Sequence, residues 1–163
     1  MEIRYITPED RLEEISNIYE QSWRYAYQNI IPQSYLDSIP SGAWVENLSR
    51  NGRGNIIMVE KDAIIGTSSL CRSRWERYGD YGEIISIYFL PEYIGKGYGK
   101  KLLEEAIKGL RALGFKDVLL WVLEDNDRAR RFYERNGFTF HGECRMDNIG
   151  GNQLREVMYE YRL

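Results

Sequence analysis

The chain has 163 residues, of which 43% are hydrophobic and 29% charged, with a formal net charge of −3. These values predict one folded domain over residues 1–163, and the acidic balance argues against nucleic acid as a partner. No stretch approaches the roughly 20 apolar residues that span a bilayer, and the N-terminus lacks a secretion signal, so we expect a cytoplasmic protein without membrane contact. Cys71, Cys144 and His141 show no metal-ligand spacing, so we expect no metal site.

The first third of the chain predicts a strand and two helices. Residues 2–6 alternate as an edge strand does. Residues 7–10 (TPED) have the features of a helix start: a capping Thr, Pro at the first helical position, and acids that favour the helix dipole. A second helix is predicted through residues 44–48.

Between these helices lies an unusually aromatic segment, residues 21–35. Aromatic side chains at helical spacing most often belong to a hydrophobic core. Two of them, Trp23 and Tyr27, are also candidates for the wall of a substrate cleft. Both interpretations stay open at this point.

Two strands are predicted next, over residues 55–60 and 63–71, joined by a short turn. The following segment, residues 72–82, is rich in charges and is typical of a solvated hairpin tip. Its aromatic residues Trp75 and Tyr78 could equally flank a substrate.

A buried strand, a glycine loop and a helix form the centre of the sequence. Residues 84–90 are a continuous apolar run that suits a strand buried on both faces, and Pro91 ends it. Apolar residues then recur at the spacing of one helix face from Leu102 to Leu110. Between strand and helix stand Gly95, Gly97 and Gly99. The first turn of a helix has free N–H groups and a partial positive charge, so this arrangement predicts a phosphate-binding site.

The glycine spacing narrows the choice of nucleotide. A dinucleotide-binding loop has GxGxxG, and a P-loop has GxxxxGK followed by Ser or Thr. Here the loop is GxGxG followed by two lysines. A nicotinamide-dependent dehydrogenase is therefore disfavoured.

The remaining chain predicts a strand, a helix and two further strands. Gly114 ends the first helix, and residues 118–123 form a second buried strand, which makes a parallel pair with the central strand. Asn126 or Asp127 caps the next helix. Residues 138–141 and 156–162 are predicted to pair in antiparallel fashion around a polar loop.

Two segments resemble signatures of the GCN5-related N-acetyltransferase (GNAT) superfamily. The loop IGKGYG resembles its acyl-CoA-binding motif, except that Ile94 replaces the usual Gln or Arg. The segment after the second buried strand matches the pattern Asn-x-x-Ala-x-x-Phe-Tyr-x-x-x-Gly-Phe at Asn126, Ala129, Phe132, Tyr133, Gly137 and Phe138. The resemblance implies an α/β (α+β) fold: a mixed, mostly antiparallel sheet, flanked by helices, whose central parallel strands splay apart around acyl-CoA.

The same resemblance implies an N-acetyltransferase that uses acetyl-CoA as co-substrate. The acceptor would be a primary amine of a small molecule, or a peptide N-terminus or lysine, attacking directly in a ternary complex. A homodimer would be in keeping with the family. The alternative is a non-catalytic acyl-CoA-binding sensor, against which the presence of both catalytic candidates argues.

Those candidates are Tyr133, which would protonate the thiolate of coenzyme A, and Glu83, which would remove the proton from the amine. Tyr133 could instead be a core tyrosine, and Glu83 an exposed residue at a strand entrance, in which case a water chain would serve as the base. Other branches take the glutamate from the next strand, where this chain has Trp121. The acyl-CoA contacts implied are Ile87, Tyr88 and Phe89 through backbone N–H groups, the loop residues Gly95, Lys96, Gly97, Tyr98, Gly99 and Lys100, and Asn126 at the pantetheine arm.

Overall fold

The computed structural model, which describes all 163 residues, is built on a seven-stranded mixed sheet of order β1-β2-β3-β4-β5-β7-β6. The strands are β1 (Glu2–Tyr5), β2 (Arg53–Glu60), β3 (Ala63–Arg72), β4 (Gly82–Phe89), β5 (Asp117–Leu123), β6 (Thr139–Ile149) and β7 (Asn152–Arg162). All neighbours are antiparallel except β4 and β5. The predicted fold class, including the parallel central pair, is therefore confirmed.

Helices cover both faces of the sheet. They are α1 (Leu12–Ala26), α2 (Gln33–Ser38), α3 (Val45–Leu48), α4 (Tyr98–Ala112) and α5 (Asp127–Arg135), with short 3-10 turns η1 (Glu76–Tyr78) and η2 (Pro91–Tyr93). In β2, Ile56 and Met58 pack in the cluster that contains the buried side of α4, whereas Ile57 packs with α1. Because alternate strand residues point to opposite faces, α4 and α1 lie on opposite sides of the sheet. None of the helices is long and apolar enough to cross a membrane.

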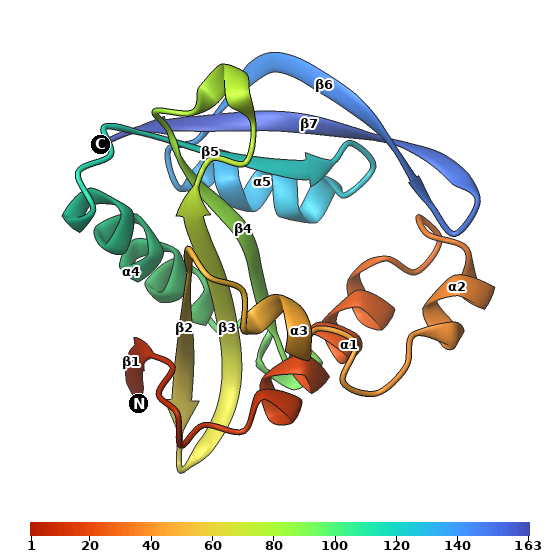
Figure 1. Cartoon of the computed structure of the whole chain (residues 1–163). Helices are drawn as coiled ribbons and strands as arrows, with labels where there is room; N and C mark the ends of the chain where they lie inside the picture. The colour runs from red at the N-terminus through yellow and green to blue at the C-terminus, as the bar shows by residue number, and fades with distance from the viewer.

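The central parallel strands pair only at their first residues. Gly82 lies opposite Val118 and Glu83 opposite Leu119, and no further pairing follows. Figure 1 shows β4 and β5 running in clearly different directions beyond this point. On its other side, β4 shifts register against β3, which leaves Ile85 as an extra residue between Ile84 and Ser86. Such a bulge bends a strand, and the bend helps β4 turn away from β5.

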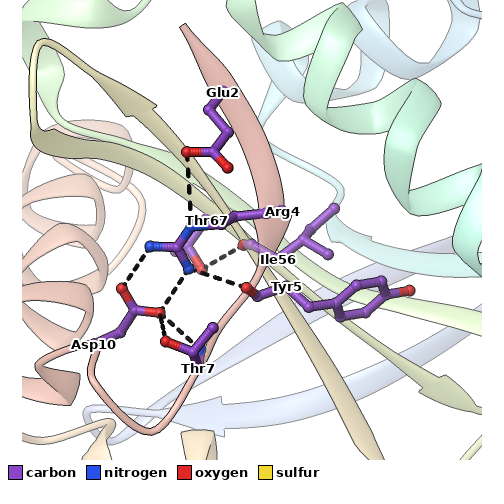
Figure 2. Close-up of polar contacts among 7 residues, drawn as sticks. All are labelled: Glu2, Arg4, Tyr5, Thr7, Asp10, Ile56 and Thr67. Carbon is purple, nitrogen blue, oxygen red and sulfur yellow. Dashed lines mark hydrogen bonds and ion pairs between the residues drawn. The ribbon is translucent and has the colours of Figure 1, made fainter.

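The predicted helix start at residues 7–10 is wrong. The helix begins at Leu12, and its N-cap residue, Arg11, makes no side-chain capping bond. Instead Asp10 accepts hydrogen bonds from the backbone N–H and the hydroxyl of Thr7, and both of its oxygens accept from the guanidinium of Arg4 (Figure 2). The charge-assisted contact of Asp10 with Arg4 on β1 therefore holds residues 7–10 in a tight turn that precedes the helix.

This turn makes stability depend on pH. The hydrogen bonds from Arg4 hold the pKa of Asp10 well below its usual range. A depressed pKa stabilises the folded chain above the unfolded value of about 3.9, and that contribution is lost as the pH falls toward the folded pKa. We expect Asp10→Asn to lower the melting temperature at pH 7, with the difference from wild type shrinking below about pH 4. Thermal melts at both pH values check this; a difference independent of pH would contradict it.

Two other predictions about the elements need correction. The polar segment after residue 141 is not a loop, because β6 and β7 continue through it to a turn at Gly150 and Gly151. The helix predicted through residues 44–48 is only the single turn α3, and the short helix α2 precedes it. The two predicted strands of the β2–β3 hairpin and the buried strand β5 are confirmed.

Candidate active site

A large cleft of about 1010 Å³ opens where β4 and β5 diverge. Its walls come from α1, β4, β5, α5 and the β6–β7 hairpin, together with the glycine loop before α4. The residues of β4 after Glu83 have no strand partner on the β5 side. Ile87, Tyr88 and Phe89 all line the cleft. Because successive N–H groups of a strand point alternately to its two sides, the N–H groups that face away from β3 are free to bind a ligand in the gap.

The glycine loop meets the cleft at the N-terminus of α4. Gly97 is the N-cap of the helix and has φ +83°, and Gly95 has φ +81°, both in the left-handed region. A Cβ added at either position would have no neighbour within 4 Å, so nothing in the protein blocks access to this turn. Gly99 serves another purpose, because a Cβ there would come within 3.2 Å of the Phe132 ring. It allows α4 to pack closely against α5.

Three basic residues line the cleft. They are Lys100, Arg128 and Arg135, whereas Arg131 does not line it, and the guanidinium of Arg128 lies 5.6 Å from the centroid of the Tyr25 ring on α1. The side chains of two other predicted loop residues turn elsewhere: the ammonium of Lys96 lies 5.1 Å from the Tyr93 ring centroid, and the hydroxyl of Tyr98 donates to Glu60 at 2.8 Å. Any contact of Lys96 or Tyr98 with a ligand would therefore be through the backbone.

The helix α5 presents two predicted residues to the cleft. Asn126 is the N-cap, and its side-chain oxygen accepts from the backbone N–H of Ala129 at 3.2 Å, which fixes the side chain at the cleft wall. Tyr133 lines the same cleft and packs edge-on against Phe132 and Phe138. Burial raises the pKa of Tyr133, as does, to a lesser degree, its neighbour Tyr88. The phenol therefore keeps its proton at neutral pH.

The aromatic residues predicted from the first helix reach the cleft from α1. Trp23 donates its indole N–H to the Tyr88 hydroxyl at 3.1 Å, and the hydroxyls of Tyr27 and Tyr88 lie 3.2 Å apart. Trp23 and Tyr27 line the cleft and also pack on a small hydrophobic cluster around Leu36. Trp23 and Tyr27 are therefore both part of the hydrophobic packing and part of the cleft wall.

Glu83 lines the cleft but is held by Arg74. Arg74 donates four hydrogen bonds to it, one from the backbone N–H and three from the guanidinium, the shortest 2.6 Å. The Glu83 side chain is 1% exposed and that of Arg74 44%. Arg74 therefore reaches into the site, whereas Trp75 and Tyr78, the residues of this segment expected to flank a substrate, do not line the cleft.

A second ion pair was not recognised from the sequence. Arg145 on β6 bonds to Glu156 on β7 at 2.5 Å, and its guanidinium lies 4.3 Å from the Trp75 ring centroid and 5.1 Å from that of Trp121. Arg145, Glu156 and the neighbouring Asp147 all line the cleft. Only the pairing of β7 with β5 brings these residues to the site, and no motif marks them.

Comparison with known proteins agrees with this geometry. The model of the acetyltransferase (GNAT) family matches residues 12–138. An uncharacterized N-acetyltransferase of Bacillus subtilis, YuaI, is 32% identical over 148 residues, which cover 90% of this chain and 84% of the relative. The chain therefore belongs to the GNAT family and is an N-acetyltransferase.

Two further relatives cover nearly the whole chain. The spermidine N(1)-acetyltransferase of Thermoplasma acidophilum is 27% identical, with 98% of each chain covered. The crystal structure of the PaiA N-acetyltransferase from the same organism, in complex with coenzyme A, superimposes with a TM-score of 0.77 at 24% identity, covering 99% of this chain and 98% of that one. The second likeness supports the fold.

Proposed function

We propose that this N-acetyltransferase transfers an acetyl group from acetyl-CoA to a primary amine while both substrates occupy the cleft. Acetyl-CoA supplies the acetyl group as a thioester. The observation that supports this most strongly is that one cleft contains an open glycine-capped helix N-terminus and, on the facing helix, a buried protonated tyrosine. The first suits a pyrophosphate, and the second suits a leaving group that needs a proton.

The residues present fit coenzyme A. The loop around Gly95 and Gly97 has open space where a Cβ would stand, so phosphates can approach the backbone N–H groups of Gly95 to Lys100. Lys100, Arg128 and Arg135 add positive charge to the cleft, Lys100 next to the loop itself. The N–H groups between Ile87 and Phe89 that face away from β3, and the amide of Asn126, would hold the pantetheine arm and the acetyl oxygen.

Tyr133 would supply the proton that the departing thiolate needs. Its hydroxyl lines the cleft and is kept neutral by burial, so it can donate at neutral pH. Glu83 as the base that deprotonates the amine stays a prediction, and its four hydrogen bonds from Arg74 argue against it in this conformation.

The other end of the cleft favours a cationic acceptor. Three carboxylates, Glu83, Glu156 and Asp147, line it together with two guanidiniums, those of Arg74 and Arg145. Both guanidiniums are paired with glutamates, so Asp147 remains uncompensated. This charge would attract an ammonium group. The similarity to a spermidine N(1)-acetyltransferase makes a polyamine the first acceptor to test.

Thiol release from acetyl-CoA tests the function directly. The purified protein would be assayed with spermidine, a single amino acid, an aminoglycoside and a short peptide, with calorimetry of coenzyme A binding in parallel. We expect coenzyme A to bind and at least one amine to stimulate thiol release, with the polyamine ahead of the amino acid. Failure of coenzyme A to bind would contradict the proposal.

A further inference from the structure

We propose that Glu156 on β7 is the general base that receives the proton of the acceptor amine, and that Glu83 positions Arg74 instead. This inference rests on the proposed function, since it concerns the same acetyl transfer. It assigns the base to a strand for which the sequence offers no motif.

A base needs an oxygen with a free lone pair facing the substrate. In Glu83, both carboxylate oxygens accept hydrogen bonds from Arg74. In Glu156, the Nε and Nη2 atoms of Arg145 both contact the same oxygen, Oε2. The other oxygen, Oε1, has no protein partner, and the side chain, 13% exposed, lines the cleft. Glu156 can therefore accept a proton without breaking its ion pair.

The position of Glu156 also suits the reaction. It pairs with Leu123 at the end of β5, well past the point where β4 and β5 separate. Burial raises the pKa of Tyr27 to about 12, and both Tyr133 and Glu156 add to that increase through their charges. Tyr27 therefore lies within electrostatic range of both the proposed acid and the proposed base, and all three residues line the same cleft.

Arg145 keeps Glu156 in place, and burial improves Glu156 as a base. Arg145 is held by its contacts with Trp75 and Trp121, and so anchors Oε2. Burial raises the pKa of Glu156; Arg145 and Arg74 oppose this, and Asp147 adds to it. A carboxylate with a higher pKa takes a proton from an amine more readily.

The proton and electron count closes with two residues. Glu156 Oε1 takes one proton from the ammonium, and the freed nitrogen lone pair forms the bond to the acetyl carbon. The carbon–sulfur bond breaks with its electron pair on sulfur, which takes the proton of Tyr133. The nitrogen bonded to the acetyl carbon still carries a second proton, which passes to the phenolate of Tyr133 and restores the phenol. Glu156 is left with one proton more, and because it lines the cleft it returns that proton to water.

Two amines of different basicity separate this role from a structural one. Spermidine is protonated at neutral pH and needs a base, whereas methoxyamine is already unprotonated. We expect Glu156→Gln to lower kcat for spermidine about 10²-fold, the lower end for a positioned base, and to lower the rate with methoxyamine far less. The pH profile of kcat/KM should fall on its acidic side in the wild type, and Glu156→Gln should lose this acidic limb.

Two further variants complete the test. Glu83→Gln should lower the melting temperature but keep the acidic limb. Glu160→Gln, on the same strand and outside the cleft, is the control for a change of charge on β7 and should behave as wild type. If wild type acetylates spermidine and Glu156→Gln does so equally fast, or if Glu83→Gln alone loses the acidic limb, this inference fails and the proposed function stands. Wild-type protein that acetylates neither these two amines nor any amine of the panel overturns both.

Discussion

Replacing Gly97 by glutamate is expected to abolish coenzyme A binding while the protein stays folded. A Cβ at Gly97 meets no protein atom within 4 Å, so the new side chain extends into open space beside the proposed phosphate site. Two like charges about 4 Å apart near a protein surface repel by about 4 kcal/mol, which corresponds to a loss of affinity of about 10²- to 10³-fold. Isothermal titration calorimetry with coenzyme A measures this loss.

The matched control is Gly114→Glu. Gly114 follows the C-terminus of α4, has φ +90° and likewise has no neighbour within 4 Å of an added Cβ. Both variants therefore impose a side chain on a left-handed backbone, which costs about 1–2 kcal/mol of stability, but only Gly97 lies at the cleft. Gly114→Glu should melt at a similar temperature to Gly97→Glu and bind coenzyme A normally. Normal binding by Gly97→Glu would place the phosphates elsewhere.

Replacing Tyr133 by phenylalanine is expected to lower turnover by about 10²-fold or more with little change in affinity for acetyl-CoA. The ring packing against Phe132 and Phe138 is kept, and only the hydroxyl is lost. Because the hydroxyl is proposed to protonate the thiolate as it leaves, its loss should reduce kcat rather than the binding of the intact thioester. Steady-state kinetics and calorimetry on the same preparation measure the two quantities.

Tyr81→Phe is the control for this substitution. Tyr81 is a partly buried tyrosine that packs beside Tyr78 and lies outside the cleft. Its loss of a hydroxyl should leave turnover unchanged. If Tyr133→Phe also turns over at the wild-type rate, Tyr133 is not the acid and serves only in packing.

The parts of the site that lie close together in sequence were predictable. The strand β4, the glycine loop and the start of α4 follow one another directly, so local patterns of apolar residues and glycines defined them. The cap of α5 was likewise predicted, and Asn126 performs it. These segments contain most of the residues proposed to hold coenzyme A.

The acceptor end was not predictable, because it is assembled by contacts distant in sequence. Glu156 reaches the cleft through the pairing of β7 with β5, and Arg145 through the pairing of β6 with β7. The bulge at Ile85 could not be predicted either, because an extra apolar residue does not stand out in a continuous apolar run. The prediction of a helix start at residues 7–10 was wrong for the same reason, because Arg4 on β1 determines the conformation of Asp10.

If this cleft moves an acetyl group from sulfur to nitrogen, an isotopic label in the acetyl group will follow the same path. Acetyl-CoA labelled with ¹³C in the acetyl group would be incubated with the protein and spermidine, and the products identified by mass spectrometry. We expect labelled N-acetylspermidine and free coenzyme A in equal amounts. Label recovered only in acetyl-CoA or in free acetate, across spermidine and every amine of the panel, would contradict it.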